Sequence, residues 1–233
     1  MKGLIASVLI ACAIGAAVAA TPAPRRATPL AIAFLFDFSI SVSNQNTESY
    51  PQWALASEGV VQGLRRGDSL RIGVVANRLT LGPWLSEKEI AALFGVAPIV
   101  ADRDRFGPTP LWDEIDAAVA ALAADHRDGR STILVVTDGR STGNARSLTQ
   151  VIDHAKAARV SVSSVVEQTL MLRPNTHAPV DPGDNMQSLA SATGGLVEKD
   201  DGTSARGGIK SALMRILVQL RASAEGVSTR PER

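Results

Sequence analysis

The sequence has 233 residues, of which 45% are hydrophobic and 20% are charged, a composition typical of a globular protein with one domain and short extensions. Its 24 basic and 23 acidic residues give a formal net charge of +1. The two signs are well mixed, so no basic tract or face supports nucleic acid binding.

The N-terminus has the three parts of a secretory signal peptide. Lys2 supplies the positive charge, an apolar stretch runs from Leu4 to Ala16, and Ala17-Val18-Ala19 is a small-residue cleavage pattern. We therefore expect residues 1–20 to be a signal peptide and the protein to be exported, either to the periplasm or as a secreted protein. Residues 21–28 are predicted to be a short linker.

The single cysteine offers an alternative for this segment. Leu9-Ile10-Ala11-Cys12 resembles the lipobox of bacterial lipoproteins, and lipidation of Cys12 would attach the protein to a membrane. Cys12 comes early and the apolar run continues past it, which favours a cleaved signal. The mature protein then has no cysteine, which excludes disulfides, thiolate metal sites and thiol nucleophiles.

Strand and helix patterns alternate between residue 29 and about residue 222. Short continuous apolar runs, typical of strands buried on both faces, cover residues 30–36, 70–76, 132–137, 160–166 and 196–197. Apolar residues at three- and four-residue spacing predict helices containing Trp53 to Leu64, Ile90 to Phe94, Leu111 to Leu122, Leu148 to Ala155, Asp184 to Thr193 and Ile209 to Leu220. Residues 223–233 are polar and are expected to be a disordered tail.

Capping residues support the predicted helix starts. Two capping boxes are predicted, at Ser86 with Glu89 and at Ser147 with Gln150. Thr109 is an N-cap candidate before Pro110, and Asp184 with Gln187 marks an acidic helix start. The alternation predicts an α/β fold, a doubly wound and mostly parallel central sheet with helices on both faces, formed by one domain over residues 29–222.

Five oxygen-bearing side chains are expected at one edge of this sheet. Asp37, Ser39 and Ser41 follow the first strand, Asp138 follows the strand at 132–137, and Thr109 precedes a helix that begins near the same edge. Ligands of such sheets bind outside the carboxyl ends of the strands. Two carboxylates and three hydroxyls suit a hard cation such as Mg²⁺ and leave it an open position.

The motifs Asp-x-Ser-x-Ser, Gly-Pro-Thr-Pro-Leu and Thr-Asp-Gly, in this order, resemble the metal-ion-dependent adhesion site of von Willebrand factor A (VWA) domains. Bacterial exported members also carry a late segment like Leu189 to Gly195. The resemblance implies a Rossmann-like VWA fold in which Ser39 and Ser41 bind the ion directly. It implies that Thr109 joins them when a ligand is engaged, and that Asp37 and Asp138 act mainly through water.

The same resemblance implies a partner and a cofactor. The partner is a protein that presents an Asp or Glu to Mg²⁺, or to Mn²⁺ or Ca²⁺. Ile40, Trp112 and Arg140 are candidates for partner contact, although Trp112 is equally compatible with packing against a neighbouring helix. Ile40 and Val42 depart from the Gly and Met usual in bacterial members, and neither position supplies a metal ligand.

Other readings remain open. A metal-dependent hydrolase is one, but the chain has no Gly-x-Ser-x-Gly elbow, no phosphate-binding loop and no histidine placed as a base, so we expect a binding protein and no enzyme. A metal-free scaffold with a degenerate site is another. Arg66-Gly67-Asp68 spells an integrin-recognition motif, but Gly-Asp is ordinary turn chemistry at this point.

Overall fold

The computed structural model describes residues 28–39, 41–42, 49–93, 98, 100, 102–125, 127, 129–167, 182–200 and 208–224. The predicted signal peptide, Cys12, all but the last residue of the linker and the last nine residues, 225–233, lie outside the described residues. Among the helices that the structure describes, none combines the length and the apolar character needed to cross a membrane.

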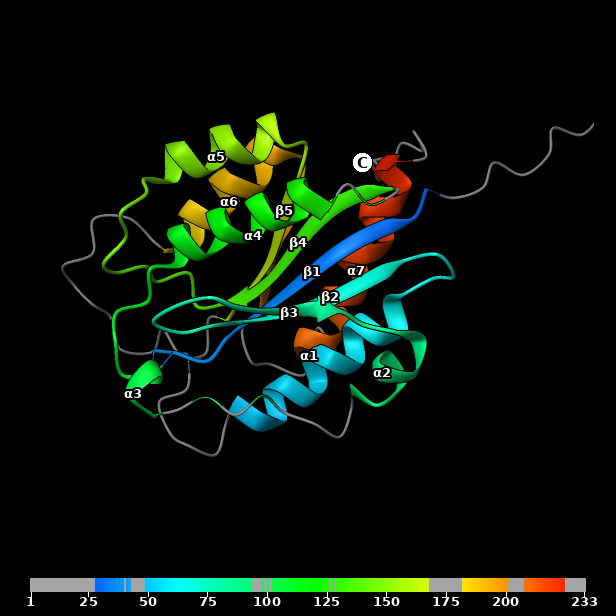
Figure 1. Cartoon of the computed structure of the whole chain (residues 1–233), viewed down its shortest axis with the longest axis horizontal. Coiled ribbons are helices and arrows are strands. Elements are labelled where there is room, and N and C mark those ends of the chain that lie inside the picture. Colours follow the sequence, from blue (N-terminus) through cyan, green and yellow to red (C-terminus); the bar gives the residue numbers. More distant parts are fainter. Residues whose placement is uncertain are drawn as a thin grey trace, which may run out of the picture.

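A six-stranded sheet with the order β3-β2-β1-β4-β5-β6 forms the centre of the fold (Figure 1). The strands are β1 (Leu30–Asp37), β2 (Ser69–Val75), β3 (Thr80–Trp84), β4 (Arg130–Thr137), β5 (Ser161–Glu167) and β6 (Val197–Asp200). All neighbours are parallel except β2 and β3. The first strand is buried along its whole length, as expected for a central strand covered on both faces. The predicted fold class is confirmed.

Helices cover both faces of the sheet (Figure 1). The helices are α1 (Ser49–Gly63), α2 (Glu87–Ala91), α3 (Asp102–Arg105), α4 (Leu111–Asp125), α5 (Leu148–Ala157), α6 (Pro182–Thr193) and α7 (Gly208–Ala224). One face packs against α1 and α7, and the other packs against α4, α5 and α6. Helix α7 continues to Ala224, so the predicted domain boundary at residue 222 falls within its last turn.

Each face has its own apolar core. Aromatic rings dominate the α1 side, where Phe34 stacks on Trp53 at 5.8 Å and Phe36 meets the same indole edge-on at 5.6 Å. Aliphatic side chains dominate the α4 side, where Leu35 and Val135 pack under Ile115. Alternate residues of the central strands point into the two cores. Packing on both faces therefore fixes the register of the strands and the positions of their ends.

Two short elements escaped prediction. The edge strand β3 contains Gly82 and Pro83, which argue against a strand but are tolerated at a sheet edge, where one side of the backbone needs no partner. Helix α3 has four residues, too few to show a helical period. Both lie on the chain between β2 and α4.

Two of the four predicted helix caps match the structure. The capping boxes at Ser86 and Ser147 both form. Helix α6 instead begins at Pro182, and Gln187 donates to Ser191 Oγ at 3.0 Å rather than capping the start. Its end is as predicted, because Gly194 takes a φ of 73° that favours glycine.

A buried ion pair closes the end of the sheet opposite the carboxyl ends of its parallel strands. Arg221 of α7 donates to Asp68, and the side chains are 4% and 2% exposed. The same carboxylate accepts the backbone N–H groups of Leu30 and Arg65, both at 2.8 Å. Asp68 therefore joins β1, α7 and a tight turn, and its burial agrees with a structural role for Arg66-Gly67-Asp68.

Candidate metal site at the carboxyl ends of the central strands

The junction of β1 and β4 forms the base of the candidate site. Phe36 and Val136 are ladder partners, so Asp37 and Thr137 lie opposite each other at the two strand ends. The Thr137 hydroxyl donates to Asp37 Oδ2 at 2.7 Å and accepts the backbone N–H of Gly139 at 3.0 Å. Asp37 and Thr137 are completely buried, so the sheet fixes this carboxylate firmly.

The two serines sit on a turn directly after β1. Asp37 Oδ1 accepts the backbone N–H of Ser39 at 2.8 Å, and the backbone N–H of Val42 donates to Ser39 O at 3.1 Å. The Ser39 and Ser41 hydroxyls are 3.0 Å apart. The turn thus brings two predicted hydroxyl ligands together beside a predicted carboxylate, while Ile40 between them lies outside the described residues.

Asp138 follows β4 and faces the serine turn. Its Oδ1 accepts the backbone N–H of Arg140 at 2.9 Å. Its Oδ2 is buried and makes no hydrogen bond of normal geometry with any described residue, although Arg140 Nε lies 3.6 Å away. A buried carboxylate oxygen with an incomplete set of partners is costly unless another group satisfies it.

Thr109 is held against the loop that follows β4. Its backbone N–H donates to the Thr142 hydroxyl at 3.0 Å, and its carbonyl accepts the Thr142 N–H at 2.9 Å. The side chain is mostly buried, with 6% of the residue exposed. These bonds connect Thr109 to the segment that carries Asp138, as the topology predicted.

The prediction that Thr109 caps α4 is wrong in two respects: the helix begins one residue later than predicted, and another side chain caps it. The first helical bond runs from Glu114 N to Pro110 O, and the helix begins at Leu111. Asn144 Oδ1 instead caps the Trp112 N–H at 2.9 Å. A side chain from a distant loop has taken the capping position, which leaves the Thr109 side chain out of that task.

The loop after β4 is fastened to the start of α4 at a second point. The Asp113 carboxylate accepts the backbone N–H groups of Ala145 and Arg146 at 2.8 and 2.6 Å. Trp112 is 7% exposed and packs within the α4-side core, which favours its packing role over partner contact. Arg140 keeps 36% of its side chain exposed beside Asp138.

Burial of two carboxylates close together perturbs their ionisation. Burial, and then the charge of Asp138, raises the pKa of Asp37 to about 7, against a lowering by hydrogen bonds from Ser39 and Thr137. Burial also raises the pKa of Asp138, against hydrogen bonds from the Arg140 backbone and Ser41. A divalent cation between them would favour both ionised forms.

Two further buried glutamates stand close enough to act on this site electrostatically. Glu114 of α4 is 3% exposed and Glu167 at the end of β5 is fully buried. Burial and neighbouring acids raise the pKa of Glu114 to about 9 and that of Glu167 to about 8. Neither glutamate belongs to a motif in the sequence, although Glu114 interrupts the apolar face of its helix between Leu111 and Ile115, which is a detectable signal.

The donor set fits a hard cation that is bound in part by hydroxyl groups. Across the described ranges, no cluster of three or more His, Cys, Asp and Glu side chains is arranged to hold a metal, so an ion would depend on Ser and Thr oxygens as well as carboxylates. That requirement is met by the paired hydroxyls of Ser39 and Ser41 and by the Asp138 oxygen that lacks a full set of hydrogen bonds. The raised pKa of Asp37 agrees with a carboxylate that a cation would stabilise in its ionised form. The roles of the five residues stay predictions.

Comparison with solved structures identifies the fold. No family model and no curated protein sequence matches the chain. A conserved hypothetical protein, BatB from Bacteroides thetaiotaomicron, matches with a TM-score of 0.57 and 16% identity over 83% of this chain and 99% of that one. A von Willebrand factor type A protein from Catenulispora acidiphila matches with a TM-score of 0.59 and 13% identity over 85% of this chain and 43% of the other.

A third structural neighbour is a metal-loaded protein. Proximal thread matrix protein 1 of the mussel byssus, with a zinc-occupied MIDAS (metal-ion-dependent adhesion site) motif, matches with a TM-score of 0.59 and 17% identity. The alignment covers 83% of this chain and 46% of that chain. At these identities the likeness concerns the fold, and the chain has the VWA-type fold.

Proposed function

We propose that this protein is an exported interaction module that binds an acidic group of a protein partner through a divalent cation. The observation that carries the proposal is the grouping of Asp37, Ser39, Ser41 and Asp138 at the carboxyl ends of adjacent central strands. The mussel protein with a zinc-occupied motif on the same fold supports divalent metal binding.

Each residue has a separate task in the proposed site. The Ser39 and Ser41 hydroxyls would hold the cation directly, with Thr109 joining them on partner binding. Asp37 and Asp138 would neutralise it, largely through water. When bound, the cation would act as a Lewis acid that can accept a carboxylate of the partner. Arg140 lies beside Asp138 with 36% of its side chain exposed, where it would favour an anionic partner.

The arrangement favours binding over catalysis. Both buried carboxylates are hydrogen-bonded to fixed backbone groups, and His154, the one histidine among the described residues, pairs with Asp116 instead. The Ser39 hydroxyl lies 3.0 Å from the Ser41 hydroxyl and shares the Asp37 carboxylate with the Thr137 hydroxyl and the Ser39 backbone N–H, so no base in the described part of the chain is reserved for activating it as a nucleophile. The first alternative, a hydrolase, would require a base positioned to act on a nucleophile. The second alternative, a metal-free scaffold, would require only the fold.

Calorimetric titration of the purified protein with Mg²⁺ and Mn²⁺ tests the proposal. We expect one-to-one binding that Asp37→Ala and Ser39→Ala both abolish while circular dichroism shows an unchanged fold. Asp153→Asn, on the exposed face of α5, is the matched control and should bind normally. Absence of binding to the wild-type protein, with or without acidic peptides present, would favour the metal-free scaffold.

A further inference from the structure

One exposed aromatic side chain lies on the segment that leads from α3 to Thr109. Among the described residues, the large hydrophobic side chains that remain exposed are Leu55, Phe106 and Val218, at 47%, 64% and 56%. Leu55 and Val218 lie on the outer faces of α1 and α7. Phe106 follows α3 and precedes Thr109 by three positions in the chain, so it belongs to the loop that carries a predicted metal ligand.

The backbone that carries Phe106 is held on both sides. Arg105 is 8% exposed, and its Nε donates to the carbonyl of Phe38 at 3.3 Å. The backbone N–H of Asn77 donates to Asp104 O at 3.0 Å, and its amide donates to Asp104 Oδ1 at 3.2 Å. These contacts fix the preceding turn while the ring of Phe106 stays outside.

Close packing continues on the other side of the ring. A Cβ at Gly107 would lie 2.9 Å from Asn77 Cβ, so the chain passes here with no room for a side chain. Two residues later, Thr109 is bound to the loop after β4 through both its N–H and its carbonyl. Phe106 is therefore an exposed ring between two anchored points.

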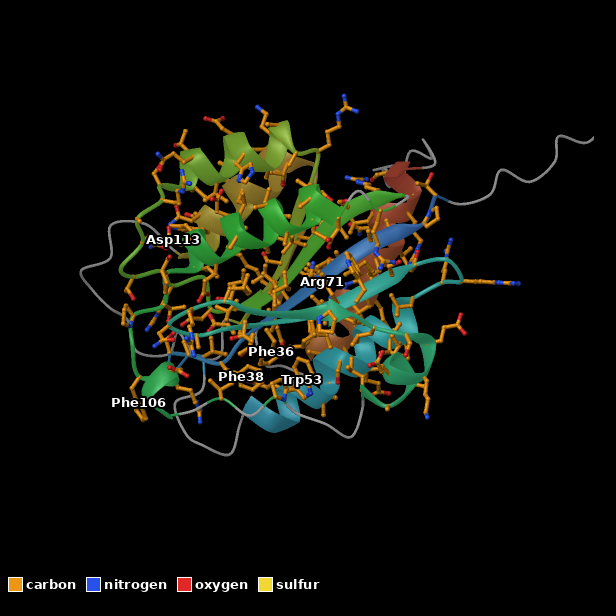
Figure 2. All side chains as sticks on the ribbon, in the orientation of Figure 1. Phe36, Phe38, Trp53, Arg71, Phe106 and Asp113 are labelled. Carbon is orange, nitrogen blue, oxygen red and sulfur yellow. The ribbon has the colours of Figure 1, made fainter. Side chains whose placement is uncertain are left out.

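These anchors also place the ring next to the metal-binding segment. Phe38, whose carbonyl accepts the Arg105 bond, stands between Asp37 and Ser39. Figure 2 shows Phe106 at the outer edge of the molecule beside α3, near the end of the sheet where Phe38 lies and far from Arg71. A partner that reaches the site between Ser39 and Thr109 would pass close to this ring.

We propose, on the basis of the proposed function, that Phe106 is an apolar anchor that selects partners whose metal-binding Asp or Glu is flanked by a large apolar side chain. Aromatic residues on a fixed backbone lose little conformational entropy on binding and are frequent energetic centres of interfaces. Arg140 provides charge complementarity to the acidic residue of the same segment. The partner is thus an exposed peptide segment with adjacent acidic and apolar residues.

Selection from a phage-displayed peptide library, with one fixed central Glu and all other positions random, tests this inference. The wild-type protein is immobilised and panned in Mg²⁺, with EDTA elution. We expect enrichment of Leu, Met, Phe or Tyr within a few positions of the Glu. The enriched peptides should bind Phe106→Ser at least about tenfold more weakly, the loss typical of truncating an aromatic anchor, whereas Phe106→Leu and the exposed-site control Val218→Ser should bind nearly as the wild type does.

The outcomes separate this inference from the proposal on which it rests. Peptides that need Mg²⁺ and the fixed Glu, but bind Phe106→Ser as tightly as wild type, would overturn the role of Phe106 and leave the metal-dependent function standing. Absence of any Mg²⁺-dependent selection, together with absence of Mg²⁺ binding in calorimetry, would overturn both. Because Phe106 is 64% exposed, its substitution leaves the core intact.

Discussion

Glu114 makes the stability of the metal-free protein dependent on pH in an unusual direction. The side chain is almost completely buried on the sheet-facing side of α4, and neither carboxylate oxygen makes a hydrogen bond of normal geometry with a described residue. Burial, followed by the nearby charge of Asp37, raises the pKa of Glu114 from 4.5 to about 9. The folded protein therefore keeps a proton that the unfolded chain releases.

The sign and size of the effect follow from this shift. Below pH 4.5 both states are protonated and Glu114 costs nothing in ionisation. Between pH 4.5 and about 9, the free energy of unfolding falls by up to about 1.4 kcal/mol per pH unit. At pH 7 the accumulated loss is about 3 kcal/mol. Gln cannot ionise, so Glu114→Gln is expected to recover about this amount at pH 7 and little at pH 4.

Urea unfolding of the two proteins in EDTA, followed by circular dichroism from pH 4 to pH 8, measures the difference. Glu58→Gln is the control, because Glu58 is partly exposed and pairs with Lys210 on the surface, where such pairs contribute less than about 1 kcal/mol. A stability difference between Glu114→Gln and wild type that stays constant with pH would refute the reasoning. So would a control that reproduces the same pH-dependent gain.

Three further changes have defined outcomes. Asp68→Ala leaves Arg221 buried without its charge partner, so we expect a loss of about 3–5 kcal/mol in urea unfolding; a loss below about 1 kcal/mol would contradict the burial of this pair. Gly195→Ala would place a Cβ 1.9 Å from the Val162 carbonyl oxygen, so soluble, folded protein should be scarce, and a normal melting temperature would argue against this close approach. Asn144→Ala removes the side-chain cap of α4 and should lower the free energy of unfolding by about 1 kcal/mol. It should also weaken Mg²⁺ binding, because the Thr109 loop is held less firmly. Unchanged Mg²⁺ affinity in calorimetry would show that the cap does not support the site.

The sequence predicted the central strands well because their apolar runs leave few alternatives. The run from Leu30 to Phe36 is too short and too continuous for a surface helix, and every residue of the strand that it forms is buried. Since Asp37 and Asp138 follow such runs directly, their place at one sheet edge followed from topology alone. The capping boxes at Ser86 and Ser147 were predictable because all their bonds are local.

Features that depend on distant segments could not be read from local patterns. Thr109 has the residue type and position of an N-cap, but Asn144 fills that role from another loop. The strand β3 forms despite Gly82 and Pro83, because β2 offers it a free edge. In the sequence Thr137 stands out only as the first residue of the Thr-Asp-Gly motif, because its bond to Asp37 depends on the register of two strands that are far apart in the chain.

The fastening between the loops of Thr109 and Asp138 has a consequence for how such a site can evolve. One bond joins Thr142 N to Thr109 O through backbone atoms alone, and every residue type except proline supplies the same N–H donor at position 142. Point substitutions can therefore change the ligands or the surface around them while the two loops keep their mutual position. Insertion or deletion in either loop is the genetic change that would separate them, so variation in loop length, more than variation in residue type, sets the range of sites open to this scaffold.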